Sequence, residues 1–211
     1  MGEVRSKDGT TIAFEWSGEG PPLILVVGAF NDRATGAPLA AALQERFTVF
    51  NYDRRGRGDS TDTLPYAVER EVEDIEALIE EAGGSASVFG YSSGAVLALR
   101  AAAHGLSIPK LALYDPPVSA DGGAGRLRED LAARLAGLVE EGRRGEAVEL
   151  FQTEVVGLPA EVVAQIRQAP FWPALEAMAH TLVYEIEILG DGSLPVEMVL
   201  WYEIFEGDVG R

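Results

Sequence analysis

One serine stands in a setting that suits a nucleophile. The segment FGYSSG, residues 89–94, places Ser92 between Gly90 and Gly94, after a short apolar run and before the helix-forming string AVLALRAAA. Two glycines leave room for a sharp turn from strand to helix, which exposes the serine between them. Its hydroxyl would lie at the positive end of the helix, where developing negative charge is stabilised. The pattern predicts a nucleophilic serine, with an ordinary strand-to-helix turn as the alternative.

The two histidines of the chain are the candidate bases, because a serine hydroxyl becomes a good nucleophile only when a base removes its proton. His104 follows Ser92 on the same expected helix, about 18 Å away at 1.5 Å per residue, and is interpreted as a residue of the helix C-terminus. His180 shares a helix face with Glu176 and Glu187, which indicates a solvated or partner-facing histidine. It is a candidate base only if that face overlooks Ser92.

The segments around Ser92 alternate between strands and helices. A period-two pattern over residues 11–16, preceded by Asp8-Gly9, predicts a hairpin with the start of the chain. Apolar runs predict buried strands, and the amphipathic or alanine-rich segments between them predict helices. We therefore expect an α/β fold with a mostly parallel sheet flanked by helices. The expected strands are 21–30, 47–52, 87–90 and 110–114, and the expected helices are 38–46, 68–80 and 93–104.

The pattern changes after residue 123, where only helical segments follow. We expect residues 1–123 to form the core and residues 124–190 to form a helical cap after the sixth strand. The last cap helix is expected to span 175–186. Residues 191–211 contain the apolar stretch 196–205, a candidate remnant of a further core strand.

Two further segments add to the Ser92 turn. Residues 53–60 read DRRGRGDS, which fits the Asp-x-Arg-Gly-x-Gly-x-Ser turn found after the fourth strand of many α/β-hydrolases. Residues 27–30 read VGAF where that family places its oxyanion turn, although relatives often have His-Gly in place of Val-Gly. Over residues 1–190 the chain resembles the α/β-hydrolase fold family, in particular small bacterial hydrolases with a helical cap.

The resemblance implies that Ser92 is the nucleophile of a serine hydrolase that acts on a small ester or related acyl substrate through an acyl-enzyme. The amide of Ser93 would be one oxyanion donor, and the amide of Ala29 or Phe30 would be the other. A noncatalytic or fragmentary relative that acts as a binding protein is one alternative. A cofactor-free lyase or perhydrolase on the same scaffold is another, because fold does not fix reaction.

The acid and the base are not settled by the resemblance. Complete relatives continue the sheet after the cap with two more strands, the first leading to the acid and the second to the histidine. There is room for the first alone, which makes Asp208 a candidate acid, with a solvated carboxylate as the alternative. Asp115, after the strand 110–114, is a second candidate acid, with capping of turn amides as the alternative. A shortened chain, a strand-swapped chain and a noncatalytic relative remain open explanations.

The chain of 211 residues has 34 acidic and 17 basic residues, a formal net charge of -17, which disfavours nucleic acid and anionic membranes as partners. No signal peptide or membrane span is recognisable, so a cytoplasmic protein is expected. Without cysteine, and with two histidines on separate helices, no thiolate site, metal site or cofactor is predicted. The expected partners are a small-molecule substrate and, through an exposed sheet edge, a second copy of the chain.

Overall fold

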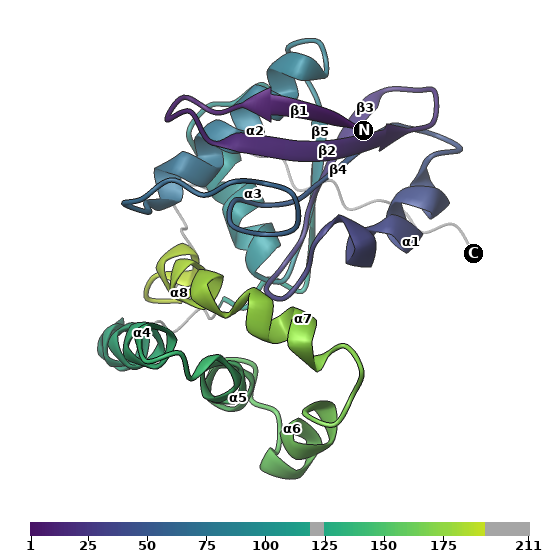
Figure 1. The fold of residues 1–211 in the computed structure, drawn as a ribbon. Coiled ribbons are helices and arrows are strands. Elements are labelled where there is room, and N and C mark those ends of the chain that lie inside the picture. Colours follow the sequence, from purple (N-terminus) through teal and green to yellow (C-terminus); the bar gives the residue numbers. More distant parts are fainter. Residues whose placement is uncertain (119–124, 193–211) are drawn as a thin grey trace, which may run out of the picture.

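The computed structural model describes residues 1–118 and 125–192, and within them a six-stranded sheet has the order β1-β2-β4-β3-β5-β6. The first two strands are antiparallel to each other, and β2 is antiparallel to β4. The other neighbouring pairs are parallel, which confirms the expected mostly parallel α/β sheet (Figure 1). The strands are β1 (Gly2–Arg5), β2 (Thr11–Ser17), β3 (Pro22–Val26), β4 (Thr48–Tyr52), β5 (Ser87–Tyr91) and β6 (Leu111–Tyr114).

Helices cover both faces of this sheet because the strand residues alternate in direction. On β3, Leu23 and Leu25 pack on one face with Ala40 of α1. Ile24 and Val26 pack on the opposite face with residues of α2 and α3. The sheet is therefore buried on both sides, as the uninterrupted apolar run of β3 predicts. The flanking helices are α1 (Arg33–Leu43), α2 (Val68–Glu81) and α3 (Ser93–Ala103).

The helix α1 differs from its expected range of 38–46. It begins at Arg33, because Asp32 and Thr35 form a capping box before the alanine-rich segment. The Asp32 carboxylate accepts from the Thr35 amide at 2.9 Å, and the Thr35 hydroxyl accepts from the Asp32 amide at 2.8 Å. These two bonds satisfy amides that a helix start leaves free, so Pro38 lies inside the helix and not at its entry.

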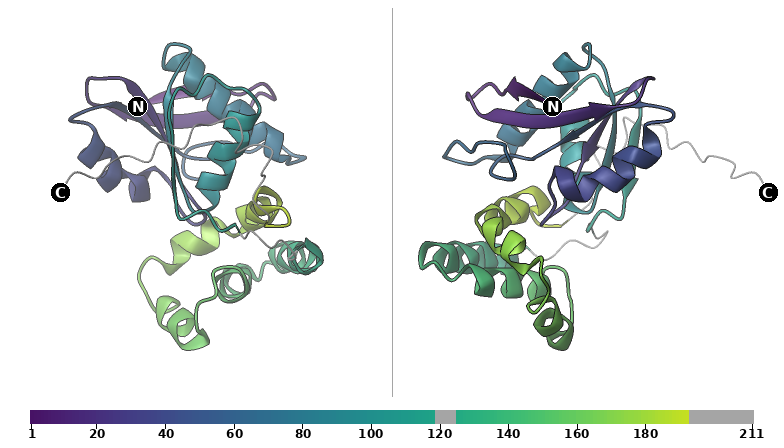
Figure 2. Two further views of the ribbon diagram at one scale, coloured as in Figure 1. Left: turned by 180° about the vertical axis from the view of Figure 1, so that it is seen from behind. Right: turned by 45° about the vertical axis from the view of Figure 1, so that its right-hand side comes forward.

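A second group of helices follows β6 and gathers at one end of the sheet, as all views show (Figures 1 and 2). We call this group the helical layer. Its own apolar cluster includes Leu135, Phe151, Trp172 and Leu182. The layer comprises α4 (Gly125–Glu140), α5 (Arg144–Glu154), α6 (Ala160–Ile166), α7 (Trp172–Ala177), the 3₁₀ turn η1 (Ala179–Thr181) and α8 (Leu182–Leu189).

The prediction of one continuous helix over 175–186 is wrong. The chain there forms α7, η1 and α8 in succession. Met178 leaves helical geometry with φ −90° and ψ 0°, and its carbonyl accepts from the amide of Thr181 at 2.9 Å, three residues later, as in a 3₁₀ turn. The hydroxyl of Thr181 donates to the same carbonyl at 2.9 Å. This break changes the direction in which His180 and the residues of α8 face.

The apolar stretch 196–205 lies outside the described residues, so its assignment to a further core strand stays a prediction. The division into core, cap and remnant also stays a prediction. Within residues 1–118 and 125–192, none of the helices combines the length and the apolar composition needed to cross a membrane.

Candidate active site

Ser92 occupies the sharp turn that the sequence predicts, between the end of β5 at Tyr91 and the start of α3 at Ser93. Its backbone has φ 54° and ψ −132°, a conformation that residues with a side chain rarely adopt. A Cβ on Gly90 would lie 2.6 Å from the Gly94 carbonyl oxygen, and a Cβ on Gly94 would lie 2.6 Å from the Val27 carbonyl oxygen. Only glycine fits at either position, which explains the spacing of the motif.

The turn lies where three strand ends meet. Gly90 of β5 is paired with Val26 of β3 on one side and with Leu113 of β6 on the other. The amide of Ser92 donates to the carbonyl of Tyr114 at 3.0 Å. The segments that leave the carboxyl ends of β3, β5 and β6 are therefore neighbours, and ligands of open α/β sheets bind at such ends.

Gly28, just after β3, lies directly against Ser92. A Cβ built on Gly28 would be 2.9 Å from the Ser92 Cβ and 3.4 Å from its Oγ. The predicted oxyanion turn is thus close enough for its amides to reach a group bound to the serine oxygen. A side chain at this position would fill the space between the turn and the serine.

Two arginines hold the turn by its carbonyl groups. Arg54 donates through Nη1 to the carbonyl of Val27 at 3.2 Å. Arg57 donates through Nη1 to the carbonyl of Gly28 at 2.7 Å and to that of Asn31 at 3.2 Å. Because both guanidinium groups are buried, these bonds face no competition from bulk water.

The amides of the same turn are left available. The Asn31 side chain donates to the Ala29 carbonyl at 2.6 Å, so this carbonyl is also engaged. Phe30 has a positive φ of 59°, an uncommon conformation for a residue with a side chain. Among the described residues, the amides of Ala29 and Phe30 have no acceptor, and the amide of Ser93 is that of the first residue of α3. These amides are therefore free to bind an acceptor near Ser92.

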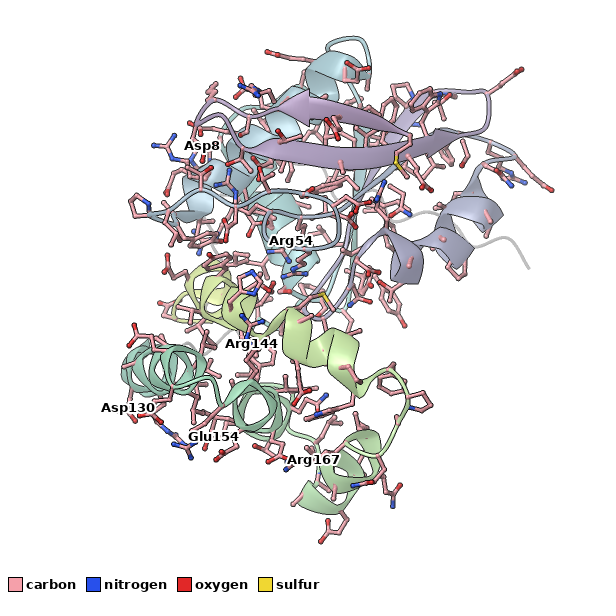
Figure 3. All side chains as sticks on the ribbon, viewed as in Figure 1. Asp8, Arg54, Asp130, Arg144, Glu154 and Arg167 are labelled. Atoms are coloured by element: carbon pink, nitrogen blue, oxygen red, sulfur yellow. The ribbon has the colours of Figure 1, made fainter. Side chains whose placement is uncertain are left out.

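The arginines that hold the turn have buried carboxylate partners. Arg54 binds Glu71 of α2 with two bonds of 2.7 and 2.8 Å, and reaches Glu185 of α8 through Nη1 at 2.8 Å. Arg57 donates to the same Glu185 oxygen through Nη2. Burial, opposed by Arg54, raises the pKa of Glu71, but the attraction of Arg54 prevails and holds that pKa below its ordinary value. Figure 3 shows Arg54 where the core meets the helical layer.

Sequence reasoning missed Arg54, Arg57 and Glu185. The motif match identified residues 53–60 as a turn and assigned no role to its arginines. A usable signal is the group of three arginines directly after a buried apolar strand. Arginines near such a strand are buried only when they are paired, so the group indicates buried carboxylate partners. A second signal is Glu185 inside the mostly apolar segment of α8, LVYEIEIL.

Neither histidine is hydrogen-bonded to Ser92 in the described part of the chain. His104 caps the far end of α3, where its exposed ring contacts the carbonyl of Arg100 at 2.9 Å. The side chain of His180, expected to be solvated or partner-facing, is half-buried. A Cβ on Gly56 would lie 3.0 Å from its Nε2 and 3.1 Å from Asp62 Oδ2, which places His180 beside that turn. Burial lowers the pKa of the His180 imidazole below its ordinary value.

Of the two candidate acids, only Asp115 lies within the described residues. Asp115 follows β6, has a positive φ of 49° and is exposed, and its neighbour Tyr114 bonds the Ser92 amide. The structure thus brings the backbone of Asp115 close to the turn. Asp208 lies outside the described residues. Among the side chains that the structure describes, no group of three or more histidine, aspartate or glutamate residues is placed to hold a metal ion.

Comparisons with known proteins agree with this geometry. The model of the alpha/beta hydrolase family matches residues 23–207. An alpha/beta hydrolase from Sphaerobacter thermophilus DSM 20745 has 55% sequence identity and a TM-score of 0.87, over 93% of this chain and 77% of that one. An enol-lactonase from Burkholderia xenovorans LB400 has the same fold, with 24% identity and a TM-score of 0.64 over 90% of this chain and 75% of that one.

A curated relative, the uncharacterized hydrolase YraK of Bacillus subtilis (strain 168), is 36% identical over 95 residues. That segment is 43% of this chain and spans only 35% of the relative's length. With the sheet, the serine turn and the family match together, the chain belongs to the alpha/beta hydrolase family. The resemblance inferred from the three sequence motifs is confirmed.

Proposed function

We propose that the chain is a serine hydrolase that cleaves a small ester or related acyl substrate through a covalent intermediate on Ser92. The observation that carries the proposal is the placement of Ser92 against the turn at Gly28, with the amides of Ala29, Phe30 and Ser93 unengaged in the described residues. Family membership makes hydrolysis the expected type of reaction, and the names of relatives do not define a substrate.

In the proposed reaction the Ser92 Oγ attacks the acyl carbon and its proton passes to a base. The carbonyl oxygen becomes an oxyanion, which the amides of Ser93 and of Ala29 or Phe30 stabilise. The bond to the leaving group then breaks, and the leaving oxygen takes up the proton. Water attacks the acyl-enzyme in a second, equivalent step and releases the acid. The described residues do not identify the base, and Asp115, His180 and Asp208 stay candidates for the remaining roles.

We assign the helical layer the role of the cap, residues 124–190, over a core of residues 1–123. Its α8 is bonded to Arg54 and Arg57, which also hold the oxyanion turn. This position at the carboxyl ends of the strands suits a cap that bounds a small-molecule site. A cytoplasmic location and a lack of nucleic-acid partners are part of the same proposal and rest on composition.

The experiment is labelling with a fluorophosphonate probe, read by intact mass. Stoichiometric labelling of the folded protein that is lost in Ser92→Ala, and kept in the control Ser85→Ala on an exposed loop, supports the proposal. Absence of labelling in the folded wild type overturns it. That result favours the alternative, a noncatalytic relative that binds small molecules, for which the lack of a histidine bonded to Ser92 in the described residues is the supporting observation.

Self-association through the sheet edge also stays a prediction. In the described residues β6 pairs with β5 on one side, and Leu113 and Tyr114 are exposed by 39% and 67%. Such an edge favours pairing with a second chain. Sedimentation that shows a monomer at high protein concentration would contradict it.

A further inference from the structure

We propose that Glu185, a residue of the helical layer, is a positioning residue that couples the docking of that layer to the geometry of the oxyanion turn. The inference rests on the proposed function, because the turn matters for chemistry only if Ser92 is the nucleophile. It adds that the oxyanion hole is held in shape by the helical layer as well as by the core. The contacts that fix it come in part from α8.

A path of hydrogen bonds runs from α8 to the turn. One oxygen of Glu185 accepts from Arg54 Nη1 at 2.8 Å and from Arg57 Nη2. The Nη1 groups of the same two arginines donate to the carbonyls of Val27 and Gly28. Each guanidinium is rigid and planar, so the position of the carboxylate sets the direction of the donors that hold the turn. Glu185 is thus one side chain away from the peptide groups Val27–Gly28 and Gly28–Ala29, the second of which carries the Ala29 amide.

Arg57 depends on the carboxylate of Glu185 for its charge partner. Arg54 has a second partner in Glu71, whereas the carboxylate of Glu185 is the single acidic partner of Arg57 in the described residues. Burial and the neighbouring Arg54 lower the pKa of the Arg57 guanidinium below its ordinary value, opposed by Glu185. Without Glu185, a buried arginine would lose its counter-charge, and it would move toward another acceptor or toward water. The carbonyl of Gly28 would then lose its donor.

A separate, apolar contact joins the helical layer to the same turn. The ring of Phe151 on α5 meets the ring of Phe30 edge to face, with centroids 5.4 Å apart. Phe30 has a positive φ, and such a conformation persists only when its surroundings hold it. Ala29 also packs on the apolar cluster of the layer. The turn is therefore held from the layer by polar and by apolar contacts.

The helical layer is also anchored at points away from the turn. The hydroxyl of Tyr184 donates to Asp62 at 2.7 Å, and its ring stacks on Tyr66 with centroids 3.8 Å apart. The Nε of Arg100 donates to the carbonyl of Ile188 at 3.1 Å. Because none of these contacts involves the side chain of Glu185, a change at Glu185 should loosen the turn and leave the layer attached.

The test compares Glu185→Gln with Glu187→Gln in the full chain. Glu187 is an exposed glutamate of the same helix, and its replacement changes the net charge by the same amount. Amide hydrogen exchange, read by mass spectrometry, should be faster over residues 27–31 in Glu185→Gln, because a loosened turn exposes its buried and half-buried amides to water more often, and unchanged in Glu187→Gln. The limiting rate of Ser92 phosphonylation should fall at least about tenfold in Glu185→Gln, while the probe concentration for half-maximal rate changes less than about twofold.

A second variant separates positioning from stability. Replacing the pair, with Glu185→Leu and Arg57→Met, leaves no uncompensated charge, and such buried pairs can be exchanged for apolar residues without loss of the fold. Exchange over residues 27–31 should still be faster than in the wild type, because the carbonyl of Gly28 has lost its donor.

The inference is overturned if Glu185→Gln and the double variant Glu185→Leu with Arg57→Met are both folded and both exchange the amides of residues 27–31 at the wild-type rate. If the wild type is not labelled at all, the proposed function fails, and the exchange measurement still decides whether the layer and the turn are coupled.

Discussion

A methyl group on the Cα of Gly28 would lie 2.9 Å from the Cβ of Ser92, closer than side-chain carbons normally approach. The carbonyl of Tyr91 blocks the same methyl group at 3.1 Å, so the turn or the serine must move. We expect Gly28→Ala to slow phosphonylation of Ser92 by about 100-fold, since the loss of an oxyanion donor has an effect of this order. Time-resolved intact mass measures the rate.

The matched control for that change is Gly137→Ala, in the last turn of α4, where an added Cβ meets nothing within 4 Å. Alanine is favoured over glycine in a helix by about 1 kcal/mol, so this variant should be as stable as the wild type or slightly more stable, with unchanged labelling. Wild-type labelling in Gly28→Ala would show that the turn does not contribute to the site.

The backbone of Ser92 predicts a conflict between stability and reactivity. With φ 54° and ψ −132°, a serine or alanine is strained and a glycine is not. Conformations of this kind destabilise the folded state by about 1–3 kcal/mol in residues other than glycine. Glycine avoids this strain, but its larger conformational entropy in the unfolded chain offsets part of the gain. We expect Ser92→Gly to be about 1 kcal/mol more stable than Ser92→Ala in urea unfolding, with both unlabelled. Equal stability would mean that the turn holds no strain.

The strands and most core helices were predictable because their signals are local. The range 68–80 was nearly that of α2, and the run 87–90 nearly that of β5, because apolar spacing alone decides which side of such elements is buried. The helix over 175–186 failed for a different reason. The apolar spacing continues from Met178 to Leu182, but the chain between them forms a 3₁₀ turn, in which the Thr181 amide donates to the Met178 carbonyl.

The site was predictable only where a motif imposes geometry. The glycines around Ser92 are required by local contacts, and the sequence shows them. The hydrogen bond of Arg54 to Glu185 joins residues 131 positions apart, and the sequence around either residue does not indicate its partner. Pairings of this kind depend on how the helical layer docks, which periodicity does not determine.

The pair of Arg54 and Glu71 should contribute strongly to stability. Both side chains are buried, and Glu71 also accepts from the hydroxyl of Tyr66 at 2.9 Å. We expect Glu71→Gln to lower the free energy of unfolding by about 3 kcal/mol, because the two buried guanidinium groups of Arg54 and Arg57 are then left with one carboxylate, that of Glu185. The exposed pair of Arg134 and Glu154 is the control, and Glu154→Gln should change stability very little. Equal effects of the two changes would show that burial of the Arg54 pair is incomplete.

His180 should make the stability of the protein depend on pH. Burial lowers the pKa of its imidazole, with Asp62 opposing and Arg144 adding to the effect, so the folded chain binds this proton less readily than the unfolded chain. The stability associated with neutral His180 is therefore fully present above the unfolded pKa of about 6.5, and it is lost as the pH falls through that value toward the folded pKa. Urea unfolding at a pH of about 7.5 and about 5.5 measures this loss.

His180→Gln should lose less stability than the wild type between these two pH values. The same variant tests the candidate base. Because the side chain of His180 lies beside Gly56 and Asp62, we expect His180→Gln to keep the labelling of Ser92. A folded His180→Gln that is no longer labelled would show instead that His180 serves as the base, and that the helical layer moves to bring it to the serine.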